Sequence, residues 1–328
     1  MNRLALSARV ERWPIAGTFS ISRGAKTEAV VVVAELADGT HRGRGECVPY
    51  ARYGETVDGV TAAIEAMRAE IGRGLDRERL QSAMVPGAAR NALDCAFWDL
   101  EAKSAGRPVH ELLGMHAPQP VTTAYTISLA TPDAMARAAA AAGERALLKI
   151  KLGAPGDPAR IAAVRRAAPR AELIVDANEG WRESDLATNL AACAEAAVTL
   201  IEQPLPAEHD DALAHIAHPL PICADESAHA SASLRALVGK YDAVNIKLDK
   251  AGGLTEAFGM AREAERLGMT LMVGCMVATS LAMAPAMLLA QRARVVDLDG
   301  PLLLARDRPN GLRYEDSRVH PAVPALWG

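Results

Sequence analysis

The sequence is poor in cysteine, and its five cysteines form no pattern. They are scattered over 328 residues, odd in number and free of any C-x-x-C pair, at Cys47, Cys95, Cys193, Cys223 and Cys275. This distribution excludes the disulfide framework of a small secreted domain, and it offers no zinc-binding cluster. We therefore expect a cytoplasmic protein in which most of the cysteines are small core residues.

The chain also lacks a basic stripe and a long apolar segment near its start. Its net charge is −4, with acidic and basic residues well mixed, so no surface is expected to bind nucleic acid. The first residues, MNRLALSARVERWP, contain no long hydrophobic run, and we expect neither a signal peptide nor a membrane anchor. Nucleic acid and membranes are therefore not expected partners.

Half of the residues are hydrophobic, which is enough for a sizeable core in one large or two modest domains. Residues 28–47 predict a hairpin, because two strand-like runs flank an Asp-Gly turn signal. From Val57 to about Gly106 the pattern is helical, and the glycine is a suitable helix stop. Strands followed by helices predict an N-terminal α+β domain over residues 1–118.

Short apolar strands then alternate with alanine-rich helical stretches. The eight expected strands span residues 121–129, 146–152, 172–178, 198–204, 220–225, 242–248, 270–276 and 294–299. Eight strands with seven helices between them are typical of a parallel β/α barrel. A doubly wound open sheet is the competing architecture, but it usually carries a glycine-rich phosphate turn, and no G-x-G-x-x-G is present. We predict an α/β fold with a (β/α)7β TIM-like barrel over residues 119–302.

Charged side chains fall at the C-terminal ends of these strands, where barrel enzymes place their active sites. In strand order they are Lys149 and Lys151, Asp176 with Asn178, Glu202, Asp225, Lys247, and Asp297 with Asp299. Barrel strands are buried on both faces, so charges inside them are costly unless they are paired or bound to a metal. Residues two apart on a strand share a face, so Lys149 and Lys151 are expected to point at one place.

Each of these charges taken singly has an ordinary structural explanation. An acid at a strand end is most often the N-cap of the next helix, and a lysine there usually reaches solvent. Asp299, just before Gly300 and Pro301, could be a turn residue. The explanation fails for the set, because caps need not recur on consecutive strands in the order Lys, Asp, Glu, Asp, Lys.

Three carboxylates on adjacent strands, Asp176, Glu202 and Asp225, can share one hard divalent cation. Oxygen ligands with open positions suit Mg²⁺. Lysines flank this cation from strands on either side. A lysine beside a metal and other cations has a lowered pKa, so it can act as a base near neutral pH. The pattern predicts a magnesium site between opposing bases.

Two bases facing each other across a metal-bound carboxylate predict racemisation or epimerisation. One of Lys151 and Lys247 removes a proton α to the carboxylate, the metal stabilises the enediolate, and the other lysine returns a proton to the opposite face. Lys149 is expected to tune the pKa of Lys151 and to help hold the substrate carboxylate.

Together these motifs resemble the enolase superfamily, in its muconate-lactonizing subgroup, over nearly the whole chain. The stretches concerned are ALLKIKLG, IVDANEGW, LIEQPLP, ICADES, VNIKLDKAGGLTEA and ALDCAFWDLEAKSAGRPVHELLG. The superfamily's general chemistry pairs a lysine or histidine base with Mg²⁺. The resemblance implies a capping domain, a barrel, and a tail over 303–328 that returns to the cap. It also implies one Mg²⁺ per subunit, supporting roles for Asn178 and Glu226 beside the metal ligands, and assembly into a homo-oligomer.

The stretch VVDLDGPLL resembles the eighth-strand D-x-D of dipeptide epimerases, whose two aspartates hold the free α-ammonium group of the substrate. Asp297 and Asp299 share a face, so both can reach one cation. The stretches FSISRGAKTEAVVVV and GECVPYARYGET resemble the specificity loops of enzymes that epimerise L-Ala-D/L-Glu, a dipeptide released from bacterial murein.

A glutamate side chain in the substrate needs a cationic partner. Arg23 is the expected partner because its planar fork matches a carboxylate, and Lys26 and Arg52 are the alternatives. A solvated arginine in a mobile loop is the ordinary explanation of Arg23.

The loop after the seventh strand departs from the resemblance. Many dipeptide epimerases carry a G-C-M-x-E-S pattern, but this chain has GCMVATSLA, with Ala278 at the glutamate position. The substrate's exact side chain is therefore open. Cys275 and Met276 are expected to line the substrate pocket, with core packing as the alternative.

These observations predict an Mg²⁺-dependent dipeptide epimerase that acts on L-Ala-D/L-Glu in murein peptide recycling, with a small dipeptide as its partner. The alternative is another enzyme of the subgroup, namely an N-acylamino acid racemase, an o-succinylbenzoate synthase or a cycloisomerase, whose substrates carry no free ammonium. A non-catalytic binding barrel is less favoured, because a drifted scaffold has no physical reason to keep carboxylates and lysines buried together.

Overall fold

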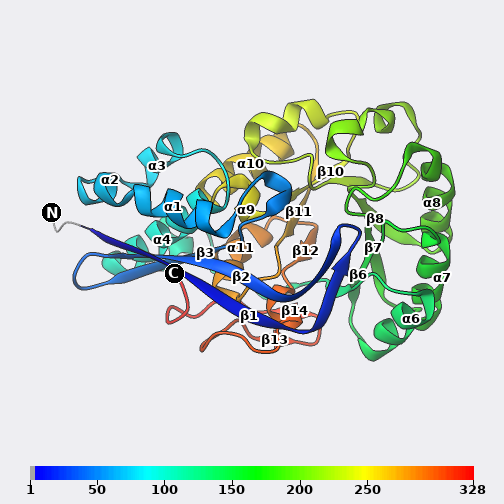
Figure 1. Ribbon diagram of the computed structural model, residues 1–328, viewed down its shortest axis with the longest axis horizontal. Helices are drawn as coiled ribbons and strands as arrows, with labels where there is room; N and C mark the ends of the chain where they lie inside the picture. Colours follow the sequence, from blue (N-terminus) through cyan, green and yellow to red (C-terminus); the bar gives the residue numbers. More distant parts are fainter. Residues whose placement is uncertain (1–3) are drawn as a thin grey trace.

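The computed structural model describes residues 4–328, which form an N-terminal sheet with helices beside an eight-stranded parallel sheet (Figure 1). The antiparallel N-terminal sheet consists of β1 (Ala5–Ile21), β2 (Gly24–Ala37) and β3 (Arg42–Cys47), in that order. The hairpin predicted over 28–47 is confirmed as β2 and β3. The long strand β1 was not predicted, because most of its side chains are exposed or half-buried and its apolar pattern is weak.

Helices follow the N-terminal sheet, as the pattern from Val57 to Gly106 predicts. They are α1 (Val57–Ala66), α2 (Arg68–Gly72), α3 (Arg77–Ala83), α4 (Ala88–Ala105) and α5 (Val109–Leu112), with a 3₁₀ turn at Ala51–Tyr53. Thr56 and Asp76 cap α1 and α3 by accepting backbone N–H groups. Gly106 ends α4 in the left-handed region, with a φ of 61°.

Helix α4 packs so closely on β3 that two glycines are required there. A Cβ atom built on Gly43 would lie 2.2 Å from the carbonyl oxygen of Ala96, and one built on Gly45 would lie 2.1 Å from that of Ala92. Both contacts are with backbone atoms, which cannot move aside without shifting the helix. The glycines therefore fix the distance between the helix and the sheet.

Replacing Gly45 by alanine is expected to lower the free energy of unfolding by about 1–3 kcal/mol, because the new methyl group forces β3 and α4 apart. Gly259→Ala is the matched control, since it lies inside α10 (Leu254–Arg266) with no neighbour closer than 3.6 Å to its Cβ position. That change should be neutral or stabilising by up to about 1 kcal/mol. Urea titrations followed by circular dichroism would measure both, and equal midpoints for the two variants would contradict the packing argument.

The parallel sheet has eight strands whose order in space follows their order in sequence. They are β5 (Tyr125–Ile127), β6 (Leu147–Lys151), β7 (Glu172–Asp176), β8 (Val198–Glu202), β9 (Ile222–Ala224), β10 (Ala243–Ile246), β11 (Thr270–Gly274) and β12 (Val295–Asp297). Its two edges meet, because the backbone N–H of Ala124 donates to the carbonyl of Val296 over 2.8 Å. The predicted TIM-like barrel with an N-terminal α+β cap is confirmed.

Five of the seven connections between barrel strands contain α-helices. These are α6 (Pro132–Ala141), α7 (Asp157–Ala167), α8 (Glu183–Glu195), α9 (Leu248–Ala251) with α10, and α11 (Ser280–Ala290). The expectation of seven helices is wrong for the other two connections. Only 3₁₀ turns join β8 to β9 (Ala207–His209 and Asp211–His215) and β9 to β10 (Ser231–Leu237). Prolines flank the first two turns and serines occupy the last, and both residue types disfavour a long helix.

The first barrel strand is shorter than predicted. The expected strand 121–129 is divided into β4 (Val121–Thr122), outside the barrel, and β5, within it. β4 pairs with β14 (Arg318–Val319), which in turn pairs with β13 (Tyr314–Glu315) in the C-terminal tail. The backbone therefore changes its hydrogen-bonding partner between Thr122 and Tyr125, and a run of apolar residues does not reveal such a change.

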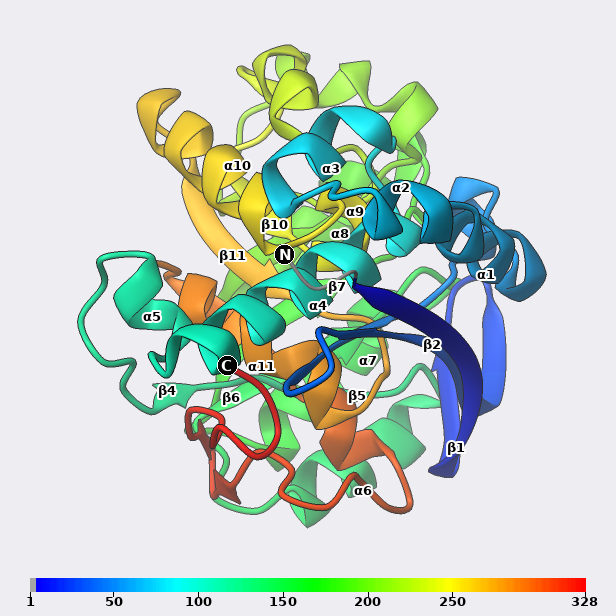
Figure 2. The same ribbon diagram turned by 90° about the vertical axis from the view of Figure 1, so that its left-hand side faces the viewer.

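The C-terminal tail reaches the N-terminal domain, and Figure 2 shows the end of the chain beside α4. The indole N–H of Trp327 donates to the carbonyl of Cys95 over 3.0 Å, and the backbone N–H of Gly328 donates to Asp99 over 2.7 Å. The domain limits 1–118, 119–302 and 303–328 remain predictions. Among residues 4–328, no helix has both the length and the apolar content to cross a membrane.

Candidate active site

Three buried carboxylates meet at the C-terminal ends of adjacent barrel strands. The pairing register places Asp176 beside Glu202 and Glu202 beside Cys223, two residues before Asp225. One oxygen from each of Asp176, Glu202 and Asp225 lies within 4.8 Å of the others, and all three side chains are at most 1 % exposed. The structure thus brings together the acids that strand spacing singled out.

Two lysines of β6 bind this cluster from one side. The ammonium group of Lys149 lies 2.6 Å from Glu202 Oε2, 2.7 Å from Asp297 Oδ2 and 3.1 Å from Asp176 Oδ2. Lys151 donates to Asp176 Oδ2 over 2.6 Å. A lysine surrounded by three carboxylates has no route to solvent, and Lys149 is 1 % exposed. The shared face predicted for the two residues is therefore occupied by acids.

Lys247 reaches the cluster from the opposite side, directly after β10. Its ammonium group donates to Asp225 Oδ2 over 2.6 Å, and its side chain is nearly buried. Strands β7, β8 and β9 separate β6 from β10 in the sheet. Lys151 and Lys247 therefore flank the three carboxylates, as a pair of opposing bases would.

The charges in this cluster shift one another's pKa values. Burial, reinforced by Asp176, raises the pKa of Glu202 to about 8. Burial acts on Asp176 in the same direction, but Lys151 and Lys149 outweigh it and hold the pKa of Asp176 below its usual value. Burial would lower the pKa of Lys247, but Asp225 and Glu202 outweigh burial and raise that pKa well above its ordinary value. The protonation state of Asp176, Glu202 and Lys247 is thus set by burial together with the charges of the neighbouring side chains.

The three carboxylates fit a hard metal ion. Opposite oxygens around an octahedral Mg²⁺ are about 4 Å apart, close to the observed spacing of at most 4.8 Å. The donors are all oxygen atoms, and their negative charge is buried, so a divalent cation would offset the cost of burying it. A cation bound to Asp225 and Glu202 would offset the negative charge that raises the pKa of Lys247. The lowered lysine pKa expected from the sequence therefore requires the metal.

Two further aspartates lie at the end of β12, because Asp297 is its last residue and Asp299 follows two residues later. Asp297 uses Oδ2 to accept from Lys149, while its buried Oδ1 has no hydrogen-bond partner among residues 4–328. Asp299 Oδ2 accepts the backbone N–H of Thr126 over 2.6 Å. Burial and the charge of Asp297 raise the pKa of Asp299 to about 7. A cation beside both carboxylates would relieve their repulsion, as the predicted contact with a substrate ammonium requires.

The loop after β11 closes another side of the site. Cys275 directly follows Gly274, which pairs with Asp297 between β11 and β12. Burial, followed by the charges of Asp297 and Asp299, raises the pKa of the Cys275 thiol. Met276 and Ala278 are buried, at 9 % and 0 % exposed. Core packing, the alternative expected for this loop, is therefore observed at Met276, and lining of a substrate pocket stays a prediction.

Sequence reasoning missed how this loop is anchored. The next residue, Thr279, donates its backbone N–H to Glu46 Oε1 over 2.8 Å, and Arg308 donates to Glu46 Oε2 over 2.6 Å. Glu46 lies on β3 of the cap and Arg308 in the tail. Partners more than 200 residues apart leave no local signal in the sequence.

Arg23 lies at the tip of the β1–β2 hairpin, which reaches the barrel near β6 and β7 (Figure 1). Its guanidinium donates to Glu226 Oε1 over 2.7 Å, to the carbonyl of Asn178 over 2.8 Å and to Glu179 over 3.0 Å. Asn178 in turn donates its backbone N–H to Asp176 Oδ1 over 2.9 Å. The hairpin is therefore connected to a carboxylate of the cluster through one residue.

The alternative cations lie near the same hairpin. Arg52 makes a two-pronged contact with Glu179 and also binds Glu208, while the Lys26 ammonium lies 5.2 Å from the ring of Tyr50. Burial and the charge of Asp225 raise the pKa of Glu226, the buried partner of Arg23, to about 7. Glu226 therefore takes up a proton more readily than a surface acid does.

Two further buried residues contact the metal candidates, and both were missed. Lys250 donates to Asp225 Oδ1 over 2.6 Å, and Asn245 donates to Glu202 Oε1 over 2.7 Å. They lie three residues after and two residues before Lys247. That spacing was a usable signal, because i+3 in a helix and i−2 in a strand both share a face with the central residue.

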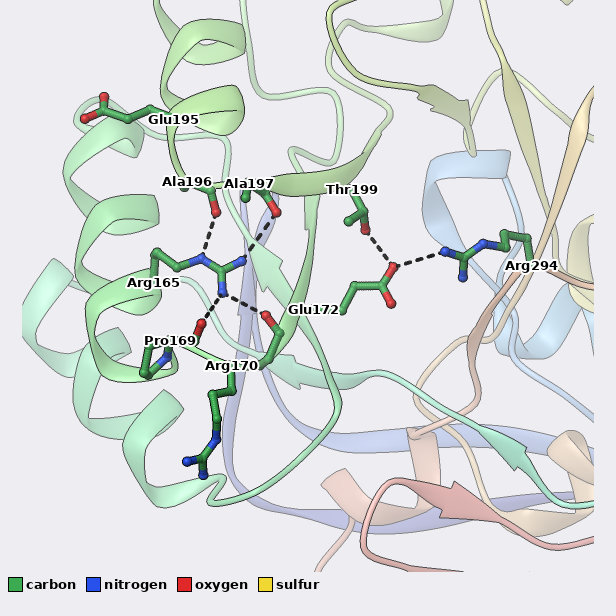
Figure 3. A pocket seen from close by; sticks show the side chains of 10 residues that line it. Arg165, Pro169, Arg170, Glu172, Glu195, Ala196, Ala197, Thr199 and Arg294 are labelled. Carbon is green, nitrogen blue, oxygen red and sulfur yellow. Dashed lines mark hydrogen bonds and ion pairs between the residues drawn. The ribbon is translucent and has the colours of Figure 1, made fainter.

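A surface pocket of about 530 Å³ lies at the other end of the barrel strands (Figure 3). It is lined by Glu172 and Thr199, near the starts of β7 and β8, whereas the candidate metal ligands end those strands. Arg165 in this pocket donates to backbone carbonyls, including those of Ala196 and Ala171 at 2.7 and 2.8 Å. The guanidinium of Arg165 is thus occupied by hydrogen bonds that hold loops together. The pocket is separate from the candidate metal ligands at the other end of the strands.

A smaller cavity of about 370 Å³ lies between the cap and the barrel, close to the carboxylates. Arg52, Tyr53 and Glu55 of the cap line it together with His229 and Lys250 of the barrel. Lys250 is the residue that binds Asp225, so the cavity extends to the immediate neighbours of the site. The cap loop over residues 51–55 therefore forms part of its surroundings.

Two family models match the chain and together cover most of it. Residues 4–114 match the mandelate racemase/muconate lactonizing enzyme N-terminal domain, and residues 131–325 match the enolase C-terminal domain-like family. An L-Ala-D/L-Glu epimerase of Escherichia coli is 47 % identical over 94 % of this chain and 97 % of its own length. An N-acetyl-D-glutamate racemase of a Pseudoalteromonas species is 46 % identical over 91 % and 95 % of the two chains.

A solved structure agrees with these matches. A crystal structure of an enolase family member from Agrobacterium tumefaciens, described as homologous to dipeptide epimerases and with bound sodium and L-Ala-L-Glu, has a TM-score of 0.98 and 57 % identity. It covers 99 % of this chain and 100 % of its own. The chain therefore belongs to the mandelate racemase/muconate lactonizing enzyme family of the enolase superfamily.

Proposed function

We propose that the chain is an isomerase, an Mg²⁺-dependent dipeptide epimerase that inverts the α-carbon of the C-terminal residue. The observation that carries this proposal is the placement of Lys151 and Lys247 on either side of three buried carboxylates. The relatives support it, because they are named as epimerases and racemases. A non-catalytic barrel would have no reason to keep these charges buried.

In this proposal the chain's own residues move the proton and orient the substrate. Asp176, Glu202 and Asp225 would hold the Mg²⁺, which stabilises negative charge on the substrate carboxylate. One of the two lysines takes the α-proton and the opposite lysine delivers a proton to the other face. Because the reaction runs in both directions, each lysine serves as base for one diastereomer and as acid for the other.

The proposed substrate is L-Ala-D/L-Glu from murein peptide recycling. Asp297 and Asp299 would receive its free ammonium group, and the unpartnered Oδ1 of Asp297 supports this role. Arg23 would exchange from Glu226 to the substrate's side-chain carboxylate. Lys149, Cys275 and Met276 would complete the pocket in the backbone region of the dipeptide.

An N-acetylglutamate racemase is the second candidate. A relative with that activity is almost as similar to this chain as the E. coli epimerase, at 46 % against 47 % identity. Both substrates present a glutamate α-carbon and side chain, but the acetylated one has no ammonium group. The buried aspartate pair favours the dipeptide, since it would face an uncharged amide otherwise.

The test of this proposal is proton exchange. The protein is incubated with Mg²⁺ and L-Ala-L-Glu in D₂O, and the glutamate α-proton is followed by NMR. Loss of that signal together with appearance of L-Ala-D-Glu is the expected result. No exchange with L-Ala-L-Glu, with rapid exchange of N-acetyl-D-glutamate instead, would favour the second candidate.

Arg23→Met should lower kcat/KM for L-Ala-L-Glu by about 10- to 100-fold, the value of a lost charge-assisted hydrogen bond. The loss should be much smaller for L-Ala-L-Gln, whose side chain carries no charge. Arg12→Met is the matched control, because Arg12 forms an exposed ion pair with Glu28 on the same hairpin. Equal losses on both dipeptides would show that Arg23 supports the hairpin and does not recognise the side chain.

A further inference from the structure

We propose that Asn245 is a positioning residue for the metal centre, whose amide orients Glu202 so that one carboxylate oxygen remains for the cation. This inference rests on the metal site of the proposed function and adds a residue that the reaction itself does not use. Asn245 lies on β10, two residues before Lys247, and its side chain is fully buried. Its Nδ2 donates to Glu202 Oε1 over 2.7 Å.

The contact belongs to a pattern shared by the three carboxylates. In each carboxylate, one oxygen accepts a hydrogen bond from a donor outside the three acids. Asp176 Oδ1 accepts the backbone N–H of Asn178 over 2.9 Å, and Asp225 Oδ1 accepts from Lys250 over 2.6 Å. The second oxygen of each carboxylate faces the lysines at the centre. Each acid is thus arranged to offer a single oxygen, and Asn245 performs this task for Glu202.

Glu202 needs such a restraint more than the two aspartates do. Its side chain has one more rotatable bond, and ordering a glutamate side chain costs about 1.5–2 kcal/mol of conformational free energy. A carboxylate that binds a cation is ionised and only accepts hydrogen bonds, so the amide nitrogen of Asn245 is the atom that must face Glu202 in the metal-bound state. The amide oxygen has no hydrogen-bond partner among residues 4–328, so the contact with Glu202 alone sets the direction of the amide.

Gly274 on the neighbouring strand β11 provides the space for this amide. A Cβ atom built on Gly274 would lie 2.6 Å from Asn245 Oδ1 and 2.7 Å from its Nδ2. The backbone of Gly274 is not in the left-handed region, so alanine is accepted there by the main chain. Gly274→Ala should therefore push the amide away from Glu202 without changing any charge or removing any polar group.

The experiment is a calorimetric titration of Mg²⁺ into the full-length, chelator-treated protein. Asn245→Leu and Gly274→Ala should each raise the Kd for Mg²⁺ by about 10- to 100-fold, the usual effect of removing a partner of a metal ligand. Asn91→Leu is the matched control. Asn91 is also a buried amide that donates to a buried carboxylate, Asp249, over 2.8 Å, but this acid is outside the cluster. Its Kd for Mg²⁺ should be unchanged.

A second comparison separates positioning from general destabilisation. In an Asn245→Ala background the amide is gone, so adding Gly274→Ala should change the Kd by less than about twofold, as expected for two changes acting through one contact. Fully additive losses, or an unchanged Kd in both single variants, would overturn the role of Asn245. If the wild-type protein itself bound no Mg²⁺, the metal assignment of the proposed function would fall, and the role of Asn245 with it.

Discussion

Lys151→Ala and Lys247→Ala will each abolish interconversion of L-Ala-L-Glu and L-Ala-D-Glu, because either direction needs both lysines. Loss of a general base or acid costs about 10²- to 10⁴-fold, so the expected epimerisation rate is near the limit of detection. Each variant keeps one base, and it should still exchange the α-proton of the diastereomer that this base serves. NMR in D₂O with each pure diastereomer measures exchange and inversion together.

The pair of variants gives a sharper outcome than either alone. If Lys151→Ala exchanges only one diastereomer, Lys247→Ala should exchange only the other, and this assigns each lysine to a face. Lys103→Ala is the control, because this lysine pairs with Asp99 on α4, away from the site. Inversion at the normal rate by Lys247→Ala would show the two-base assignment to be wrong.

Asp297→Asn will lower kcat/KM for L-Ala-L-Glu by about 10²-fold or more. Truncating one member of a buried charge pair typically costs about 3–5 kcal/mol, and the substrate ammonium would lose such a partner. The change keeps the shape of the side chain and removes its charge.

An N-acetylated substrate is the control for this variant. Asp297 also binds Lys149, so part of its effect could pass through that lysine. N-acetyl-glutamate has no ammonium group and reports only this indirect part. Equal losses for the two substrates would mean that Asp297 acts through Lys149 and does not bind the ammonium.

The sequence predicts the centre of this site well because barrel geometry converts spacing into position. Strand ends one β/α unit apart must meet at one face of the barrel, so the spacing of Asp176, Glu202 and Asp225 is enough to group them. The pairing of Lys149 with Lys151 on one face follows equally from strand geometry.

Contacts between side chains of distant elements could not be predicted in the same way. The anchoring of Thr279 by Glu46 and Arg308 joins the barrel, the cap and the tail, and no periodicity relates these residues. The same holds for Arg23, which the sequence indicated as a partner for a substrate carboxylate, because nothing in the sequence pointed to its contact with Glu226 in this structure. The short first barrel strand shows the same limit, since an apolar run does not say which neighbour it pairs with.

Under the proposed function, the hairpin of β1 and β2 would serve recognition while the barrel strands carry the reaction. Its tip contacts the barrel through the side chains of Ser22 and Arg23, which both donate to the carbonyl of Asn178, and through ion pairs of Arg23 with Glu179 and Glu226. The lysines lie on β6 and directly after β10, outside the hairpin, so a change of side chain at its tip leaves the residues that carry the proposed proton transfer in place. Such a division would let the same proton-transfer residues serve different substrates through changes in a few residues of one turn.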